Sequence, residues 1–324
     1  MKKRFLRIAL TSTLLIVALL ATLVLWASED LSSPPRRGVQ PYQEAWLSTP
    51  EKQGIRYREA TSPIGKFPYF IIEPAGSTPA KRGQTLREEL SERKLSVPQY
   101  GTTQQHLILL HGRKGSKEDL LPIAERYVAA GFRCLIPDLP GHGSNPLDRS
   151  YFGTNPENQE ALLSMVLTEE TATNFTKKPA LLGMSMGGSF ACQLAGANSE
   201  AFSKVLIINS FDELDNVINH KCETYLPGIG ELIATPVKFC SDKIWGFDIA
   251  TANSVLALQN CPLPLLVAHG DEDNFIPQTL GKRLYDSAPN TDKKWINVKG
   301  AHHTNVLVTA HPLYADTVEF LWKQ

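Results

Sequence analysis

The chain of 324 residues is long enough for one large domain of roughly 280 residues, and a domain of that size buries about three quarters of its unfolded surface. Its 33 lysine and arginine residues balance 33 aspartate and glutamate residues, and no basic stripe is interleaved with aromatic residues. This balance argues against a nucleic-acid-binding protein. The histidines and cysteines are scattered singly, so no zinc-ligand cluster is expected, and the sequence has neither a P-loop nor an internal repeat.

The N-terminus combines a cationic lead, residues 1–7, with an apolar stretch over residues 8–27. An apolar helix of this length spans about 30 Å, the thickness of a bilayer's hydrocarbon core. The stretch ends in Leu25-Trp26-Ala27, which lacks the small-x-small pattern of a cleavage site, and no lipobox cysteine follows. We therefore expect an uncleaved signal anchor over residues 1–27, with the rest of the chain facing the periplasm or the cell exterior. The alternative is a protein that is secreted after cleavage.

The remaining chain is expected to form a linker and one domain. The linker, residues 28–45, contains the Pro-rich segment Ser32-Ser33-Pro34-Pro35-Arg36-Arg37, and the domain covers residues 46–324. A charged insertion occupies about residues 77–105 of this domain and is a feature that could reshape access to a pocket.

Two apolar strands are predicted in the first half of the domain. The first, residues 106–110, ends in His111-Gly112, just before a helix that is predicted to begin near Lys117 or Glu118. We expect His111 to stabilise the turn. The second strand, residues 133–137, runs into a glycine-rich turn at residues 138–144.

The most informative motif is Gly183-Met184-Ser185-Met186-Gly187, a G-x-S-x-G pattern between a short apolar strand and the start of a helix at residues 189–195. Small residues around Ser185 allow the sharp strand-to-helix turn that presents a nucleophile. A serine hydroxyl is a poor nucleophile at neutral pH, so it needs a histidine base and a carboxylate that orients the base.

Residues 211–260 follow a predicted strand at residues 204–208 and are expected to form a small helical cap over the site. Cys222 and Cys240 lie in this cap, and in an oxidising compartment a disulfide between them would contribute about 3 kcal/mol. The sequence leaves the paired and the free state open. The cap's apolar residues either line an acyl pocket or form the cap's own packing face. They are Tyr225, Leu226, Pro227, Ile229, Leu232 and Ile233.

Two further strands, predicted at residues 263–268 and 293–298, are each followed by candidate partners for the serine. Carboxylates at the ends of parallel strands point into the crevice of an α/β sheet, where a site is expected. The spacing gives the chain order serine, acid, histidine but leaves each choice between neighbours open. The candidates are Asp271 and Asp273 for the acid and His302 and His303 for the base.

Taken together, these motifs resemble the α/β-hydrolase superfamily over roughly residues 46–324, in the order in which that superfamily carries them. The matching motifs are His111-Gly112, Asp138-x-x-Gly141-His142-Gly143-Ser144, Gly183-x-Ser185-x-Gly187-Gly188, Gly270-x-x-Asp273 and His303. Within the superfamily the chain is most similar to bacterial hydrolases related to Bem46 and to the serine-aminopeptidase or prolyl-oligopeptidase group. The resemblance implies a doubly wound, mostly parallel α/β sheet with a small helical cap, here preceded by an N-terminal transmembrane helix.

The resemblance also implies the roles of particular residues. Asp273 and His303 match the family's acid and base, which gives the catalytic triad Ser185, Asp273 and His303, whereas His302 stands where a glycine is usual. The backbone N–H groups of Met186 and Arg113 would form the oxyanion hole. His269 is expected to be a structural histidine bonded within its turn. No metal ion or organic cofactor is needed for this chemistry.

We therefore expect a serine hydrolase that acts on ester, thioester or amide carbonyls through an acyl-enzyme, first of all a membrane-anchored carboxylesterase. Its partner would be a small-molecule or lipid-like acyl substrate. A peptidase or an acyltransferase uses the same triad, and a non-catalytic binding protein of the same fold is the alternative from another class.

Overall fold

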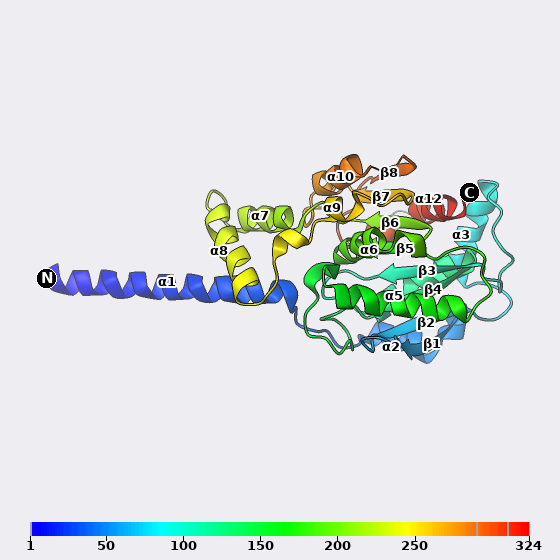
Figure 1. The fold of residues 1–324 in the computed structure, drawn as a ribbon, viewed down its shortest axis with the longest axis horizontal. Coiled ribbons are helices and arrows are strands. Elements are labelled where there is room, and N and C mark those ends of the chain that lie inside the picture. The colour runs from blue at the N-terminus through cyan, green and yellow to red at the C-terminus, as the bar shows by residue number, and fades with distance from the viewer. Residues whose placement is uncertain (1, 290, 310, 324) are drawn as a thin grey trace.

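A computed structural model describes residues 2–289, 291–309 and 311–323. Its centre is an eight-stranded sheet in the order β1-β2-β4-β3-β5-β6-β7-β8 (Figure 1). The first two strands run antiparallel to their neighbours, and β3 to β8 are parallel. The strands are β1 Ile55–Thr61, β2 Pro68–Pro74, β3 Gln105–Leu110, β4 Phe132–Pro137, β5 Ala180–Met184, β6 Lys204–Ile208, β7 Leu265–Gly270 and β8 Lys293–Val298.

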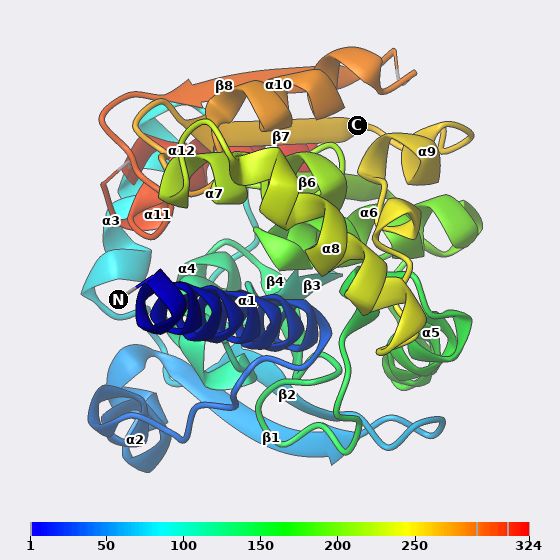
Figure 2. The ribbon, with the colours of Figure 1, turned by 90° about the vertical axis from the view of Figure 1, so that its left-hand side faces the viewer.

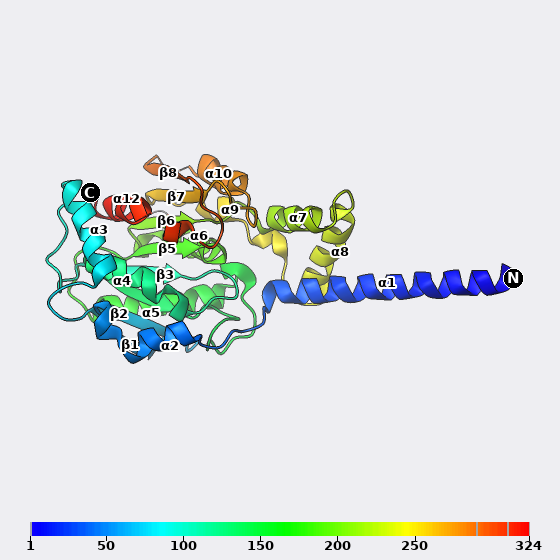
Figure 3. The same cartoon turned by 180° about the vertical axis from the view of Figure 1, so that it is seen from behind.

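Helices cover both faces of this sheet, because successive residues of a strand point to opposite faces and both faces are apolar. In β3, Ile108 and Leu110 pack with α5 (Pro156–Thr171), α6 (Met186–Ala197) and α10 (Gln278–Ser287). Leu107 and Leu109 pack on the other face, which Figure 3 shows, against the remaining helices of the domain body. These are α3 Lys81–Glu92, α4 Leu121–Ala129 and α12 His311–Trp322, while the short α11 spans Val306–Thr309.

The cap expected over residues 211–260 is helical. It consists of α7 (Leu214–Tyr225), α8 (Gly230–Lys243) and α9 (Ser254–Leu258), joined in part by a short 3-10 helix, η5 (Ile249–Thr251). Further 3-10 helices are η1 Pro50–Gln53, η2 Lys117–Leu120, η3 Tyr151–Gly153 and η4 Ser199–Ala201. The disulfide considered for this cap is not formed: Cys222 on α7 and Cys240 on α8 are free thiols in the structure.

The N-terminal helix α1 extends over Lys2–Ser32 and projects far from the sheet (Figure 1). Its segment Arg7–Ser32 is long and apolar enough to cross a membrane, a criterion that a signal sequence near an N-terminus also meets. Almost all of this segment is exposed in the structure except at its C-terminal end, where α1 packs against α8 (Figure 2).

The linker predicted at residues 28–45 is shorter than expected. Residues 28–32 continue α1, because their polar side chains find partners on the domain, and Pro41–Ser48 forms α2, a helix with proline in its first turn and a capping box at Gln40. The charged insertion at about residues 77–105 is ordered as well, since Leu86 and Leu90 of α3 are buried.

Candidate active site

Ser185 occupies the tight turn between β5 and α6, as the G-x-S-x-G motif predicts. Its backbone has φ 53° and ψ −120°, a left-handed conformation that a non-glycine residue rarely adopts and that is characteristic of functional turns. The turn is held by the N–H of Ser185, which donates to the carbonyl of Ile208, and by the hydroxyl of Ser210, which donates to the carbonyl of Ser185. A Cβ at Gly187 would lie 2.1 Å from the Leu110 carbonyl oxygen, so this position requires glycine.

The structure brings Ser185, Asp273 and His303 together. His303 Nε2 lies 3.0 Å from Ser185 Oγ, and His303 Nδ1 lies 2.7 Å from Asp273 Oδ2. The three residues stand at the carboxyl ends of β5, β7 and β8, which meet at one edge of the sheet. With Nδ1–H donated to the carboxylate, Nε2 is the acceptor for the serine proton. This arrangement can therefore perform nucleophilic catalysis.

Asp273 is built to remain ionised. Its carboxylate is fully buried, and Oδ1 accepts the backbone N–H groups of Phe275 and Ile276 at 2.9 and 2.8 Å. Burial by itself raises the pKa of Asp273, but hydrogen bonds from His269, His303 and the backbone outweigh burial and hold the pKa well below its usual range. His269 Nε2 also lies 2.9 Å from the Ile276 carbonyl oxygen, so His269 orders the turn, as predicted.

The neighbouring candidates lie elsewhere. Asp271 is exposed and accepts the backbone N–H of Gly300, and His302 is exposed, with its backbone N–H donated to Asn305 Oδ1. Among the candidates, His303 is therefore the histidine that contacts Ser185, and Asp273 is the acid that contacts His303.

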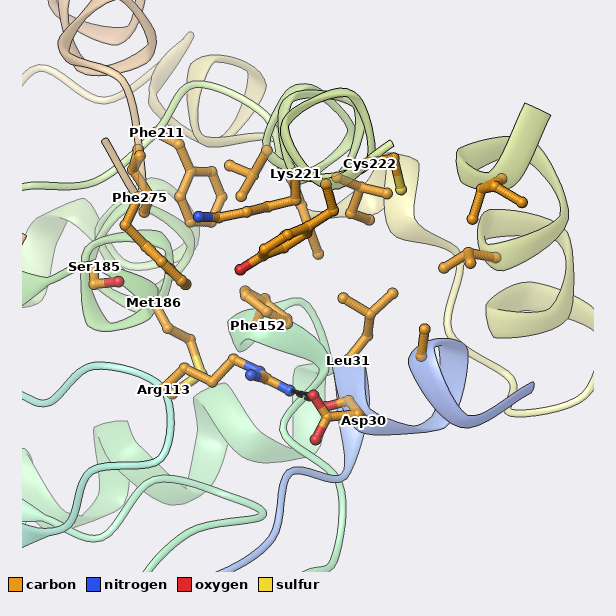
Figure 4. Close-up of a pocket in the computed structure, with 18 of the residues that line it drawn as sticks. Asp30, Leu31, Arg113, Phe152, Ser185, Met186, Phe211, Lys221, Cys222 and Phe275 are labelled. Carbon is orange, nitrogen blue, oxygen red and sulfur yellow. Dashed lines mark hydrogen bonds and ion pairs between the residues drawn. The ribbon is translucent and has the colours of Figure 1, made fainter. Parts of the chain in front are cut away.

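The two residues predicted to supply the oxyanion-hole donors, Met186 and Arg113, line the same cavity as Ser185. Met186 begins α6, and the first N–H groups of a helix have no acceptor within the helix. The loop after β3 runs beside the serine, because a Cβ at Gly112 would lie 3.4 Å from Ser185 Cβ. The side chain of Arg113 points away and forms an ion pair with Asp30 of α1 (Figure 4).

Buried polar groups hold the loop after β3 in place. His111 accepts the backbone N–H of Leu139 at 3.0 Å with Nε2, so its Nδ1 carries the proton that it donates to the Gly112 carbonyl. Burial lowers the pKa of His111, which keeps the ring neutral and makes it a turn-stabilising residue, as expected. Lys117 Nζ lies 2.8 Å from Asp138 Oδ2 in a buried ion pair, so the turn after β4 is tied to the start of η2.

Asn209 is a residue of the site that the sequence analysis missed. It follows β6 with φ 46°, and its Oδ1 accepts the N–H of Gly270 at 2.9 Å. Its Nδ2 donates to the carbonyls of His302 and His303 at 3.3 and 3.2 Å. Asn209 thereby links the end of the acid strand to the histidine loop. A single asparagine after a strand carries no sequence signal for this role.

An apolar cavity of about 520 Å³ opens beside Ser185 (Figure 4). Its wall is formed by Phe152, Phe211 and the inner side of the cap, and by Phe275, whose ring also packs against the His303 imidazole with centroids 4.8 Å apart. Of the six cap residues singled out in the sequence, Tyr225, Leu226 and Ile233 line the cavity, whereas Pro227, Ile229 and Leu232 do not.

The last three turns of α1 complete this cavity. The residues of α1 that line it are Leu23, Trp26, Ala27, Asp30 and Leu31. Polar contacts fasten this end of the helix to the domain: Trp245 Nε1 donates to Ser28 Oγ at 2.9 Å, and Arg149 donates to Ser32 Oγ at 2.9 Å. The helix that could cross a membrane is thus also a wall of the cavity next to Ser185.

Comparison with known proteins agrees with this fold. Residues 105–237 match the family model described as alpha/beta hydrolase fold. A thermostable monoacylglycerol lipase of a Bacillus species is 22% identical over 67% of this chain and 90% of its own length. Protein bem46 of Schizosaccharomyces pombe is 25% identical over 61% of either chain, and protein YfhR of Escherichia coli is 23% identical over 63% of this chain and 65% of its own. The chain thus spans less than two thirds of these last two relatives.

Two solved structures share the fold. An esterase of Pyrococcus furiosus has a TM-score of 0.61 at 17% identity, covering 89% of this chain and 98% of its own. A putative lipase of Acinetobacter baumannii has a TM-score of 0.57 at 16% identity, covering 88% and 97%. The sheet order, the family match over residues 105–237 and these similar structures agree on an α/β-hydrolase fold for this chain, and its relatives include Bem46 and YfhR.

Proposed function

We propose that this protein is a membrane-anchored serine hydrolase that cleaves carboxylic esters through an acyl-enzyme on Ser185. The observation that carries the proposal is the continuous chain of hydrogen bonds from Asp273 through His303 to Ser185, next to an apolar cavity. The esterase and lipase names among the relatives and similar structures support a hydrolase. No step of the proposed reaction needs a metal ion or an organic cofactor.

In the proposed mechanism Ser185 Oγ attacks the ester carbonyl while His303 Nε2 takes the hydroxyl proton. The buried Asp273 carboxylate stabilises the imidazolium that forms, and the backbone N–H groups of Met186 and Arg113 stabilise the oxyanion. The tetrahedral intermediate then collapses, the alcohol leaves with the proton from His303, and the acyl group remains on Ser185. Water repeats the sequence and releases the acid.

The apolar cavity is proposed to hold the acyl chain. Its lining is dominated by Phe152, Phe211 and the aliphatic residues of α7, whose burial against a hydrocarbon chain gains about 25 cal/mol per Å² of apolar surface. An acyl ester is therefore favoured over a peptide, which would bring polar backbone groups into this cavity.

Membrane anchoring is proposed from the position of α1. If residues 8–27 span the bilayer, Leu23, Trp26 and Ala27 lie in the last turns of the span, and the cavity that they line opens at the bilayer surface. An acyl chain could then pass from the membrane into the cavity without crossing water. We further propose residues 1–27 as an uncleaved signal anchor, with the domain of residues 46–324 and its cap at 211–260 facing the periplasm or cell exterior.

Active-site labelling tests the proposal. The full-length protein in detergent is exposed to a fluorophosphonate probe and assayed with p-nitrophenyl esters of increasing chain length. We expect Ser185→Ala to abolish labelling and to lower turnover by at least about 10³-fold, since the nucleophile is removed. Ser287→Ala, at an exposed serine that ends α10, is the matched control and should behave as the wild type. Well-folded wild-type protein without labelling or turnover would overturn the proposal and favour a non-catalytic binding protein.

A further inference from the structure

A second cavity, of about 1040 Å³, meets the apolar one at Ser185. Ser185, Arg113 and Lys114 line both cavities, and His303 lines the second. We call this second cavity the cationic groove. It is bounded by the loop after β3 and by parts of α2, α3 and α4. In Figure 2, α2 and α3 lie on one side of α1 and α8 lies on the other. Ser185 therefore stands between two compartments of different character.

The charge of the groove is strongly positive in a chain whose formal net charge is zero. Its cationic lining residues are Arg37, Lys81, Arg82, Arg113, Lys114 and Arg126, against a single acidic one, Asp119. Asp119 pairs with Arg37, and Asp30 pairs with Arg113 and lies 3.8 Å from Lys114.

Three of these cations have no carboxylate partner within ion-pair distance among the residues that the structure describes: Lys81, Arg82 and Arg126. Arg82 lies over the Trp46 ring and Arg126 over the Tyr314 ring, so both side chains are held in place by aromatic contacts. Glu125, whose carboxyl interacts electrostatically with Arg126 and Arg82, is buried, and burial raises its pKa to about 7, so that it is only partly ionised at neutral pH. The groove therefore presents preformed donors for an anion.

The position of His303 indicates which part of a substrate would enter the cationic groove. In acyl transfer the histidine that activates the serine returns its proton to the leaving oxygen, so the leaving group lies on the histidine's side of the serine. His303 lines the cationic groove and does not line the apolar cavity. The acyl chain and the alcohol of the substrate are thus assigned to different cavities.

We infer that the cationic groove binds the alcohol part of the substrate through a phosphate group, so that the substrate is an acyl ester of a phosphorylated alcohol, such as an acylglycerol phosphate. This inference rests on the proposed function of Ser185. Arginine side chains bind phosphate oxygens in a bidentate manner, and two charge-assisted hydrogen bonds are strong enough to set a clear preference. The reaction adds water across the ester: the hydroxyl oxygen of water joins the acyl carbon, and the leaving phosphoalcohol takes a proton through His303.

The test compares two soluble short-chain esters that differ only in the phosphate, hexanoylglycerol and hexanoylglycerol 3-phosphate, with the full-length protein in a neutral detergent. We expect kcat/KM for the phosphorylated ester to be about tenfold or more above that for the neutral ester. The double variant Lys81→Gln/Arg82→Gln should lower this ratio towards one. The control Lys52→Gln/Lys178→Gln changes the net charge equally at two exposed positions that do not line the groove and should keep the wild-type ratio.

Three outcomes overturn the inference, and they are distinguishable from failure of the proposed function. Equal kcat/KM for both esters, with Ser185-dependent labelling intact, removes the inference and leaves the hydrolase standing. An unchanged ratio in the Lys81→Gln/Arg82→Gln variant places phosphate recognition elsewhere. Inhibition of neutral-ester hydrolysis by inorganic phosphate as strong as by glycerol 3-phosphate, without a preference for the phosphorylated ester, marks a site for free phosphate. Loss of fluorophosphonate labelling in the wild type refutes the proposed function itself.

Discussion

At the scale of single residues, backbone and side-chain restraints fix the geometry of Ser185, His303 and Asp273. The left-handed φ of Ser185 is imposed by the junction of β5 and α6, where glycine neighbours allow close packing. Asp273 stays ionised because its hydrogen bonds outweigh the effect of burial on its pKa. His111 stays neutral because burial lowers its pKa. Each restraint acts between neighbouring groups in space, although Ser185, Asp273 and His303 lie far apart in the sequence.

Asn209 is expected to position His303 without touching substrate. Its amide donates to the carbonyls of His302 and His303, so removal of the amide should loosen the loop and misplace the imidazole. We expect Asn209→Gly to lower kcat for a p-nitrophenyl ester by about tenfold or more, with KM little changed, since small misplacements of a catalytic group are costly. Glycine accepts the positive φ of this position, so the variant removes the hydrogen bonds without adding backbone strain.

Steady-state kinetics on the two variants Asn209→Gly and Asn209→Ala separate the loss of the amide hydrogen bonds from backbone strain. Asn209→Ala adds strain at a positive φ and should be less stable than Asn209→Gly at a similar kcat. An unchanged kcat in Asn209→Gly would show that the loop keeps its geometry without the amide.

At the scale of elements, the parallel strands β3 to β8 were predictable from the sequence, whereas the antiparallel pair β1 and β2 and helix α3 were not predicted. The strand predicted at residues 293–298 matches β8 (Lys293–Val298), because its boundaries are marked by turn residues. Helix α3, within the charged insertion, was not predicted, since its buried side is narrow: only Gly83, Leu86 and Leu90 are buried in it. Its packing on α4 also buries Glu125, whose Oε1 accepts the N–H of Gly83.

The buried Glu125 predicts a pH-dependent stability. Because its folded-state pKa is raised to about 7, the stabilising contribution of the protonated form is complete below its ordinary pKa and is lost as the pH rises through about 7. Glu125→Gln mimics the protonated form and should raise the stability at pH 8 by about 1–3 kcal/mol, with little effect near pH 4.5. Thermal melting in detergent micelles at both pH values measures this difference.

The matched control is Glu88→Gln, at an exposed position of α3. Its melting temperature should follow that of the wild type at both pH values. A Glu125→Gln variant that is destabilised at pH 8 would mean that the carboxylate is needed in its charged form.

At the scale of the whole molecule, the N-terminal helix and the domain form one structural unit. Ser28, Asp30 and Ser32 of α1 bind residues of the domain, and the turns that carry them line the cavity beside Ser185. Cleavage after Ala27 would remove Leu23 and Trp26 from that cavity. The proposed uncleaved anchor is therefore coupled to the shape of the site.

A single substitution tests the anchor. Leu25→Ala converts Leu25-Trp26-Ala27 into a small-x-small sequence, which we expect to permit cleavage and to release the domain from the membrane. The wild type should remain in the membrane fraction after an alkaline carbonate wash and retain its N-terminal segment, as intact-mass measurement would show. Leu20→Ala, also within the apolar stretch, is the matched control and should stay anchored. Release of wild-type protein at a mass without residues 1–27 would contradict the anchor.

The sequence by itself determined the α/β-hydrolase fold, the positions of the six parallel strands and the candidates for each catalytic role, because local patterns of apolar, glycine and polar residues carry that information. It left open the choices between Asp271 and Asp273 and between His302 and His303, which the hydrogen-bonded contact of Ser185, His303 and Asp273 distinguishes. Only the tertiary structure gave the cationic groove and the part of α1 in the apolar cavity. Both are built from segments far apart in the chain, whose proximity depends on packing rather than on any local pattern.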